Sequence, residues 1–466
     1  MYIYDSVQKK KLPFEPIEEN RVSLYVCGPT VYDDAHLGHA RASLTFDLLS
    51  RTLKAHGYEV TMAKNFTDID DKIIKKVKTT GKSMEEITSY YIERYLAEME
   101  ALGIQRADIE PKATESLDAI ETMIQELLDK EIAYMISTGD IYFDTSKDTK
   151  YGTISNRIAN DEESINRVEH NIEKRNPKDF ALWKACKKED NNCFDTAFCR
   201  GRPGWHIECS AMIEKYFQGN ADYTIDIHGG GADLLFPHHE NEAAQSRCAT
   251  GHELAKYWMH NGFVQIDGEK MSKSLGNSFF LKDALKHYDG EVLRYYLNSV
   301  HYRNNFNFSE EDLRQSKKRL DKLYRLKKRI WPQKASLPNR LFKQSLLDAM
   351  ADDLNISKAL AAIDEMVAHT NELLDTNPKD KGLKKETLAN ILFIEELLGF
   401  GGKDPFFYFQ IGIDHTLKTK IEILIKERIE AKENKDFARS DAIRNELTAL
   451  GIHIMDTPDG TLWEKV

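Results

Sequence analysis

Two short motifs, far apart in the chain, constrain its fold more than any other feature. The first lies at residues 36–39 (HLGH), shortly after an apolar run at residues 22–26. This order predicts a buried strand that gives way to a helix opening near Gly38. A helix start offers unpaired N–H donors and the positive end of a dipole, which suits phosphate. The second motif lies at residues 270–274 (KMSKS), in a basic stretch between Gly268 and Gly276.

The residue types of the two motifs fit the handling of a nucleoside triphosphate. His36 and His39 can donate to phosphate oxygens as negative charge builds up, and Gly38 lets a flat adenine ring lie against the backbone. The lysines Lys270 and Lys273 can follow a departing pyrophosphate as the loop closes on its glycine hinges. Each motif alone is more often a polar loop or a solvated basic turn. Both together predict one site that activates an acid with ATP.

The motifs and the segments around them resemble the class I aminoacyl-tRNA synthetases, and the cysteinyl-tRNA synthetase family in particular. The matching segments are residues 24–32 (LYVCGPTVY), 65–72 (NFTDIDDK), 201–210 (GRPGWHIECS), 226–233 (DIHGGGAD) and 236–242 (FPHHENE). The likeness runs from the N-terminus to the last residues. Three departures are Leu37 in place of isoleucine, Phe66 in place of a smaller aliphatic residue, and an unusual segment at residues 195–200. They put local packing and the edge of an insertion in doubt, and leave the site residues intact.

The pattern of strands and helices predicts an α/β fold. Residues 22–26 and 58–63 look like buried strands around a helix at 40–56, which forms a βαβ unit with a ligand-binding first turn. We expect a Rossmann-type parallel sheet split by an insertion, then mostly helical C-terminal domains. The expected boundaries are 1–110 and 221–307 for the halves of the catalytic domain, 111–220 for the insertion, 308–400 for a helical tRNA-contacting region and 401–466 for an anticodon-recognition unit.

The composition excludes several classes of protein. At 466 residues the chain predicts two to four domains, and its 41% hydrophobic and 30% charged residues are ordinary for a soluble globular protein. No apolar run approaches the length of a membrane span, and no leader is recognisable, so we expect a cytoplasmic protein. Six cysteines without a C-x-x-C pair are unlike a disulfide scaffold. We expect Cys186, Cys193 and Cys199 to be free thiols.

The net charge of −11 hides a basic segment. Nine Lys or Arg residues fall between Arg314 and Arg329, where leucines also recur near helical spacing. We expect one side of this helix to pack and the basic side to contact a phosphate backbone, although a solvated helical face is the commoner meaning of such a pattern. The family resemblance implies tRNA(Cys), ATP with Mg²⁺ and L-cysteine as partners, with neither DNA nor a membrane.

Four residues form a candidate metal site, although little of it can be read from spacing. His238 and Glu242 lie four apart and share one helix face, and Cys27 ends the first strand at the ligand-binding edge of the sheet. From the residues alone, buried free cysteines and a surface His-Glu pair are the commoner interpretation. The family resemblance implies that Cys27, Cys209, His238 and Glu242 bind one zinc ion. Zinc binds a thiolate strongly and a hydroxyl poorly, which separates cysteine from serine without proofreading.

The resemblance also implies the remaining site residues. The amino-acid pocket is expected to include Gly28, Thr67, Trp205, His228 and Asp233, with Asp233 as a buried partner of the substrate ammonium. The ATP site is expected to include His36, Gly38, His39, Lys270, Ser272 and Lys273. The tRNA-reading end is expected to include Asp436, Arg439, Arg444, Asp456 and Trp463, with Trp463 stacked on a splayed base. Each of these C-terminal residues taken singly is as readily a surface or packing residue.

Three alternative functions can be weighed against the sequence. A cysteine ligase acting on a small amino-sugar would share the first 400 residues but lack the C-terminal unit. A catalytically silent RNA-binding paralogue is expected to have lost a motif histidine, Lys273 or a zinc ligand, and this chain has lost none. A metalloprotease is unsupported, because residues 238–242 (HHENE) lack the H-E-x-x-H spacing. The family resemblance alone implies a monomer.

Overall fold

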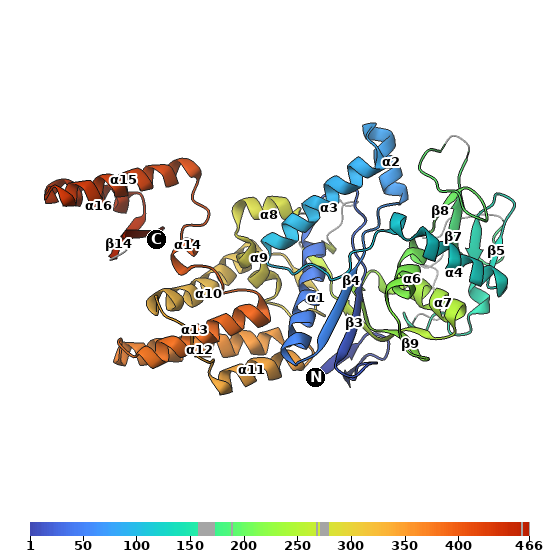
Figure 1. The fold of residues 1–466 in the computed structure, drawn as a ribbon, viewed down its shortest axis with the longest axis horizontal. Coiled ribbons are helices and arrows are strands. Elements are labelled where there is room, and N and C mark those ends of the chain that lie inside the picture. The colour runs from blue at the N-terminus through green and yellow to red at the C-terminus, as the bar shows by residue number, and fades with distance from the viewer. Residues whose placement is uncertain (157–172, 188–189, 267–268, 271–278, 458–459, 466) are drawn as a thin grey trace. The chain divides into compact units, whose positions relative to one another are not determined.

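The computed structural model describes residues 1–156, 173–187, 190–266, 269–270, 279–457 and 460–465 (Figure 1). Two compact units divide the chain. The first comprises Met1–Lys282, Leu297–Ser309 and Leu346–Ala359, and the second comprises Asp283–Tyr296, Glu310–Ser345 and Leu360–Val466.

A four-stranded parallel sheet forms the centre of the first unit. Its order is β10-β9-β3-β4, with β3 at Arg21–Val26, β4 at Glu59–Lys64, β9 at Tyr223–Gly231 and β10 at Glu253–Asn261. Helix α1 (Leu37–Ala55) connects β3 to β4. The outer strands β4 and β10 flank a buried centre, where Leu24 of β3 lies opposite Ile227 of β9. The predicted α/β fold with a parallel sheet is confirmed.

A smaller antiparallel sheet separates β4 from β9 in the sequence. Its order is β5-β6-β7-β8, with β5 at Ala133–Met135, β6 at Ile141–Phe143, β7 at Phe180–Ala185 and β8 at Gly201–Pro203. Helix α4 (Leu117–Asp129) packs against it, because Ile124, Phe143 and Trp183 share one buried apolar cluster. These strands lie between the two halves of the parallel sheet in the sequence, where an insertion was expected.

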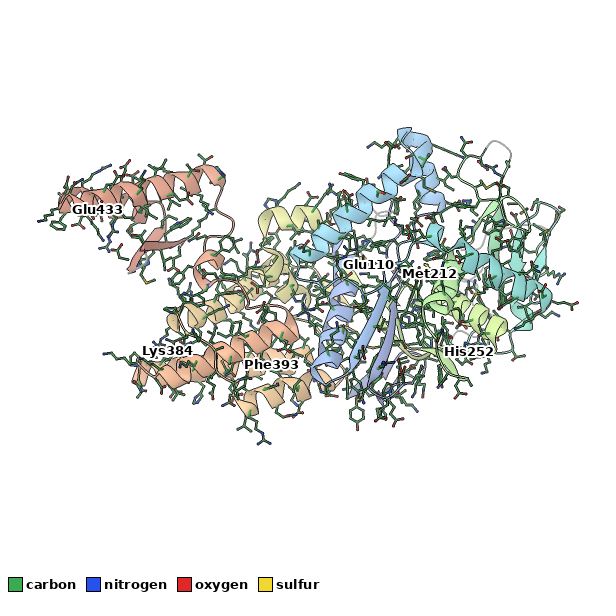
Figure 2. All side chains as sticks on the ribbon, viewed as in Figure 1. Glu110, Met212, His252, Lys384, Phe393 and Glu433 are labelled. Atoms are coloured by element: carbon green, nitrogen blue, oxygen red, sulfur yellow. A yellow bond between two sulfur atoms is a disulfide. The ribbon has the colours of Figure 1, made fainter. Side chains whose placement is uncertain are left out.

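Two helices pack on the parallel sheet. Helix α6 (Trp205–Tyr216) leads from the insertion into β9, and α7 (Glu240–Thr250) lies between β9 and β10 in the sequence. Met212 of α6, labelled in Figure 2, is fully buried in a cluster with Ile225 of β9 and Trp258 of β10. The cluster also contains Cys209, so packing of α6 on the sheet brings this thiol toward the carboxyl ends of the strands.

The other elements of the first unit are short or peripheral. They are β1 (Tyr2–Asp5), β2 (Lys10–Pro13), α2 (Asp71–Thr80), α3 (Met84–Ala101), η1 (Ala113–Glu115), η2 (Thr145–Lys147), η3 (Leu235–His239), β11 (Val264–Ile266), β12 (Glu269–Lys270) and β13 (Phe306–Asn307). Strand β11 pairs with β12 in antiparallel and with β13 in parallel register.

The second unit is built mainly from helices. Its elements, some of which cross the boundary between the units, are α8 (Leu281–His287), α9 (Gly290–Leu297), α10 (Glu310–Arg329), α11 (Arg340–Ala351), α12 (Ile356–Thr376), α13 (Lys381–Leu398), α14 (Pro405–Tyr408), α15 (His415–Glu433), α16 (Phe437–Ala449), β14 (Ile452–Thr457) and β15 (Gly460–Lys465). Within the described residues, no helix combines the length and the apolar character needed to cross a membrane.

The basic segment of the sequence forms most of α10. Its leucines, including Leu313, Leu320 and Leu323, are buried, which confirms that one side of the helix packs. Lys327 is an exception to the exposed basic side. It is buried, and its Nζ donates to the carbonyls of Gly401 (2.7 Å) and Lys403 (2.8 Å). The hydrogen bonds of Lys327 therefore stabilise the turn after α13. The other Lys and Arg side chains of the segment are exposed or half-buried.

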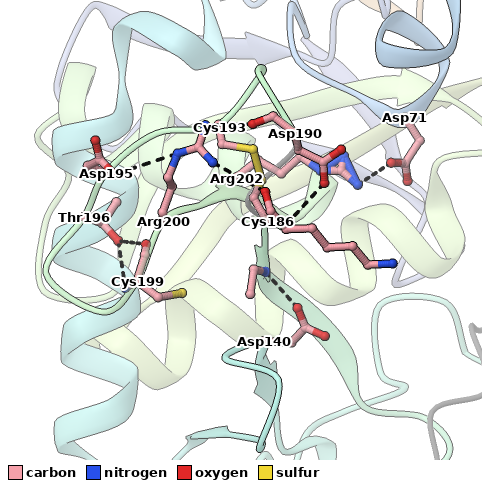
Figure 3. Close-up of a disulfide and its surroundings, with 12 residues drawn as sticks. Asp71, Asp140, Cys186, Asp190, Cys193, Asp195, Thr196, Cys199, Arg200 and Arg202 are labelled. Atoms are coloured by element: carbon pink, nitrogen blue, oxygen red, sulfur yellow. Dashed lines mark hydrogen bonds and ion pairs between the residues drawn. A yellow bond between two sulfur atoms is a disulfide. The ribbon is translucent and has the colours of Figure 1, made fainter. Parts of the chain in front are cut away.

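The cysteines correct one expectation from the sequence. Cys186 and Cys193 form a disulfide, with their Cα atoms 6.4 Å apart, in the segment that follows β7 (Figure 3). The expectation of free thiols is wrong for this pair and holds for Cys199. The disulfide forms because the chain folds back on itself after β7. Cys186 N donates to Arg200 O, and the backbone of Phe194 pairs with that of Gly201, which brings the two sulfurs together. Spacing along the sequence does not reveal such a fold-back.

Candidate active site

The four predicted metal ligands come together at the carboxyl edge of the parallel sheet. Cys27 directly follows β3, Cys209 lies on α6, His238 lies in η3 and Glu242 lies in the first turn of α7. The Sγ atoms of Cys27 and Cys209 are 3.8 Å apart, and Cys27 Sγ is 3.5 Å from Glu242 Oε1. His238 Nε2 lies 2.7 Å from the same oxygen. One ligand atom from each residue falls within 4.8 Å of all the others.

Burial and mutual charge set the protonation of this cluster. Cys209, His238 and Glu242 are at most 1% exposed. Burial raises the pKa of the Cys27 thiol well above its usual range, whereas the hydrogen bond from Cys27 lowers the pKa of Cys209 to about 6. Burial opposes a charged Glu242, but His238 and His228 outweigh it and hold the pKa of this carboxyl well below its usual range. The site therefore concentrates anionic sulfur and oxygen in a buried place, where a cation is stabilising.

Three histidines that the sequence analysis did not single out surround the cluster. His239 Nε2 is 3.4 Å from Cys27 Sγ, and its Nδ1 is 2.7 Å from His260 Nε2. His206 Nδ1 is 2.9 Å from His238 Nδ1. Burial lowers the pKa of His206 and of His260 to about 3, and that of His239 well below its usual value, so these rings are neutral. The only sequence feature that pointed to any of these three histidines is the position of His239 next to the predicted ligand His238.

The HLGH motif forms the start of α1. His36 is the N-cap residue, and its Nδ1 accepts from the N–H of Gly38 at 3.0 Å. The N–H of His36 donates to His39 Nδ1 at 3.2 Å, and the two rings stack with centroids 3.8 Å apart. A Cβ at Gly38 would lie 2.8 Å from the ring of His36, so the glycine is needed for this stack. The motif thus presents two imidazoles at the positive end of a helix.

The KMSKS motif lies mostly outside the described residues. Lys270 is the last residue of β12, where its backbone pairs with Gln265, while Ser272, Lys273 and the expected hinges Gly268 and Gly276 are not described. The chain after the motif returns to the HLGH segment, because Leu37 N donates to Phe279 O and Leu281 N donates to Ala35 O. The described residues that follow the motif, Phe279 and Leu281, therefore lie next to the HLGH segment.

A cavity of about 840 Å³ extends from Cys27, one member of the cluster, to the HLGH motif. Of the predicted substrate residues, Gly28, Trp205 and Asp233 line it, whereas Thr67 and His228 do not. Trp205 stacks on His238 with ring centroids 4.2 Å apart, so it forms a wall next to the cluster. Asp233 is exposed, which corrects the expectation of a buried charge. A Cβ at Gly28 would lie 1.6 Å from Asn65 O, so this glycine permits a close backbone approach.

The two predicted substrate residues outside the cavity lining have clear local partners. His228 is fully buried, and its Nε2 lies 2.6 Å from Glu242 Oε2, so it orients the carboxylate from behind. Thr67 is 2% exposed, and its backbone pairs with that of Pro29 and Val31 on the segment after β3. Thr67 thus supports the cavity wall at Pro29, and His228 holds a member of the cluster.

The predicted tRNA-reading residues lie in a small C-terminal substructure of α15, α16, β14 and β15. Asp436 caps α16 by accepting from Arg439 N at 3.0 Å, and the side chain of Arg439 pairs with Glu427 at 2.8 Å. Asp456 accepts two bonds from Arg428, of 2.7 and 2.9 Å. Trp463 is 7% exposed and packs in the local apolar core, so its ring is not presented to a base. Arg444 also lies on α16.

Comparisons with known families assign the successive parts of the chain. Residues 13–318 match the class I (C) catalytic domain of tRNA synthetases, residues 346–400 match the DALR domain, and residues 414–463 match the anticodon-binding domain of cysteinyl-tRNA ligase. The chain is also similar to the solved methionyl-tRNA synthetase of Mycobacterium tuberculosis in complex with methionyl-adenylate. That likeness has a TM-score of 0.60 at 14% identity, and covers 81% of this chain and 92% of the other. It shows a shared fold.

Curated relatives match along the whole chain. The cysteine–tRNA ligase of a Sulfurovum species is 77% identical over 465 residues, covering 100% of both chains. The cysteine–tRNA ligase of a Nitratiruptor species is 64% identical over 467 aligned positions, again with 100% of each chain covered. With the buried thiol cluster, the HLGH helix start and the anticodon-binding match, these likenesses place the chain in the cysteinyl-tRNA synthetase family of class I aminoacyl-tRNA synthetases.

Proposed function

We propose that this protein is a cysteine–tRNA ligase. In the first step the carboxylate of L-cysteine attacks the α-phosphorus of ATP, and pyrophosphate leaves with the electron pair of the broken P–O bond. In the second step a ribose hydroxyl at the 3′ end of tRNA(Cys) attacks the acyl carbon, and AMP leaves. The observation that carries the proposal is the single cavity that connects Cys27 of the metal cluster to His36 and His39.

We propose Zn²⁺ as the ion held by Cys27, Cys209, His238 and Glu242. Two sulfurs bound to one tetrahedral zinc at about 2.3 Å lie about 3.8 Å apart, and the two Sγ atoms have this separation. The donor set of two thiols, an imidazole and a carboxylate suits zinc better than the oxygen-loving Mg²⁺. When bound, zinc favours the thiolate of cysteine over the neutral hydroxyl of serine.

A second set of residues competes for the same ion. Cys27, His228, His239 and Glu242 also bring one ligand atom each within 4.8 Å of the others. We favour the set with Cys209 because its second sulfur is a stronger zinc ligand than a second imidazole. His228 and His239 then support the site from beside the ligands. His228 is bonded to Glu242 and to the carbonyl of Tyr25, and His239 is bonded to His260. His228 orients the carboxylate of Glu242, and the hydrogen bonds of His228 and His239 fix the tautomers of their own rings.

The walls next to the cluster suit an amino acid. Trp205 covers the metal side, and Asp233, exposed in the cavity, can accept from the substrate ammonium. Gly28 lets the substrate approach the backbone beside Cys27, while Thr67 supports this segment from behind. In this arrangement the thiol points toward the cluster and the carboxylate toward the HLGH helix.

Activation by ATP depends on stabilising the negative charge of the phosphates, and no covalent enzyme intermediate forms. His36 and His39 donate to the α-phosphate region at the N-terminus of α1, and Gly38 accepts the adenine ring against its backbone. Lys270 and Lys273 would stabilise the β- and γ-phosphates of ATP, which is bound with Mg²⁺, and Ser272 would belong to the same ATP site. Positioning of the carboxylate for in-line attack then supplies much of the rate enhancement.

The C-terminal substructure is proposed to read the anticodon of tRNA(Cys). Arg439 and Arg444 lie on α16 and can reach phosphates or base edges. Asp436 at the start of α16 and Asp456 in β14 belong to the same substructure. Trp463 contributes by holding β15 against the helices. The exposed cations of α10 can contact the RNA backbone, whose affinity then depends on salt. Since tRNA charging serves protein synthesis, we propose that the protein acts in the cytoplasm.

The test is amino-acid-dependent ATP–pyrophosphate exchange, followed by charging of tRNA(Cys). Exchange that requires cysteine, with charging of the tRNA, supports the proposal. Exchange without charging would contradict the tRNA step and favour a small amino-sugar acceptor. Absence of exchange, with tRNA still bound, would contradict catalysis and favour a silent RNA-binding protein.

A further inference from the structure

One wall of the active-site cavity carries positive charge that none of the roles above uses. Helix α2 contributes three lysines, Lys72, Lys75 and Lys76, to the lining of the cavity that also contains Cys27 and His36. Residues three and four apart on a helix share a face, with their Cβ atoms about 5–6 Å from each other. The three ammonium groups therefore form a ridge along one side of the site.

Helix α2 is held in place by contacts that do not involve the ammonium groups of Lys72 and Lys75. Its first residue, Asp71, pairs with Arg202 at 2.5 Å and Lys184 at 3.1 Å, both from the antiparallel insertion sheet. Asp70 caps the helix by accepting from the N–H of Lys72. Lys76 also helps to hold the helix, because its Nζ donates to Tyr32 O and to Tyr91 OH, both at 2.6 Å. The backbone of α2 is thus positioned independently of Lys72 and Lys75.

Lys72 and Lys75 are the members of the ridge that remain available to a ligand. Both side chains are exposed. The Nζ of Lys72 lies over the ring of Tyr32, 5.4 Å from its centroid, and Lys75 has no hydrogen bond or ion pair with any residue in the described ranges. Lysine ammonium groups bind phosphate as point charges, without the planar geometry that arginine requires.

The chemistry of the reaction indicates which phosphates these lysines meet. The triphosphate of ATP already has the start of α1, two histidines and the KMSKS lysines in the proposed function. The second substrate must bring its 3′-terminal ribose into the same cavity, and each linkage before that ribose carries one negative charge. We propose that Lys72 and Lys75 bind the phosphates that join the last nucleotides of the tRNA 3′ end, and so position its hydroxyl for transfer. This inference rests on the proposed cysteine–tRNA ligase activity.

The experiment compares the two half-reactions in the full-length protein. The test variant is Lys72→Ala/Lys75→Ala. The matched control is Lys78→Ala, a lysine of the same helix that does not line the cavity and lies 3.8 Å from Asp190. Cysteine-dependent pyrophosphate exchange measures activation, and single-turnover transfer from preformed cysteinyl-adenylate to tRNA(Cys) measures the second step. The expected result is a ratio of transfer to exchange at least tenfold lower in the double variant and within twofold of the parent in the control.

Binding of trimmed tRNA adds a readout that misfolding would not imitate. The parent is expected to bind intact tRNA(Cys) more tightly than tRNA lacking its last three nucleotides, and the double variant is expected to lose most of this difference. Equal losses in exchange and transfer would overturn the inference and assign the lysines to the phosphates of ATP. An unchanged ratio in an active enzyme would also overturn it. A parent protein without cysteine-dependent exchange would instead contradict the proposed function.

Discussion

The Sγ atoms of Cys27 and Cys209 lie 3.8 Å apart, although 182 residues separate them in the sequence. Cys27 is positioned by the end of β3, and Cys209 by the packing of α6 on the same sheet. A pair of thiols at this distance, with a buried carboxylate 3.5 Å from one of them, is costly unless a cation or a shared proton compensates. The fold therefore brings a donor set for a cation together from distant parts of the sequence.

Loss of one thiol is expected to remove the metal and the amino-acid selectivity together. In Cys209→Ala, bound zinc measured by elemental analysis should fall to a small fraction of the parent value, and kcat/KM for cysteine in pyrophosphate exchange should fall at least about 100-fold. The matched control is Cys248→Ser, a free cysteine outside the metal cluster, which should keep both. Retention of one zinc per chain by Cys209→Ala would count against the ligand set.

The carboxyl of Glu98 is expected to make stability depend on pH. Burial raises the pKa of Glu98 to about 7, from its usual value of 4.5. The folded state thus binds a proton more tightly than the unfolded state, so stability falls as pH rises from about 4.5 to about 7. Compared with the parent, Glu98→Gln should show an unchanged Tm at pH 4 and a higher one at pH 8. A Tm difference that stays the same at both pH values would refute this.

The packing of Trp463 predicts a structural role for this ring. Trp463→Ala should destabilise the C-terminal substructure by about 3–5 kcal/mol, the usual cost of emptying a buried aromatic site. Limited proteolysis between α15 and β15 should reveal it. Phe437→Ala is the matched control, because Phe437 is 65% exposed on the same substructure, and it should change stability by less than about 0.5 kcal/mol. A stable Trp463→Ala variant with weakened tRNA binding would instead support stacking on a base.

The disulfide of Cys186 and Cys193 can be checked by counting thiols. Protein purified without reductant and alkylated after denaturation should show four labelled cysteines, and reduction should raise the number to six. Cys186→Ser should show five labels with or without reduction. Such bonds are rare in the cytosol, where thiols are kept reduced, so the dithiol form is expected in a cell with a reducing interior. Six labels before reduction would contradict the disulfide in the isolated protein.

The sequence predicted the elements whose signals are local. The apolar run at residues 22–26 and the glycine of the HLGH motif identify a strand-to-helix turn, and the structure begins α1 at Leu37 with His36 as its cap. The leucine spacing in α10 likewise predicts its buried side. These features follow from hydrophobic periodicity and helix capping, which act within a few residues.

Features that depend on tertiary contacts could not be read in this way. The Cys27–Cys209 pair was inferred only through family resemblance, because no spacing rule joins residues so distant. His239 and His260 meet because η3 and β10 pack together, and Lys327 is buried because a turn from a distant part of the sequence covers it. Cys186 and Cys193 are close in sequence, yet their pairing depends on the fold-back of residues 194–201. In each case long-range packing determined the partner.

The most direct measurement for the account as a whole is the preference for cysteine over serine in pyrophosphate exchange, before and after removal of zinc. Zinc-loaded protein should use cysteine with a kcat/KM at least about 10⁴-fold above that for serine, a ratio that shape alone does not reach. Chelator-treated protein should lose cysteine-dependent exchange, and one equivalent of Zn²⁺ should restore it. A zinc-free protein, verified by elemental analysis, that still prefers cysteine to the same degree would contradict metal-based selection.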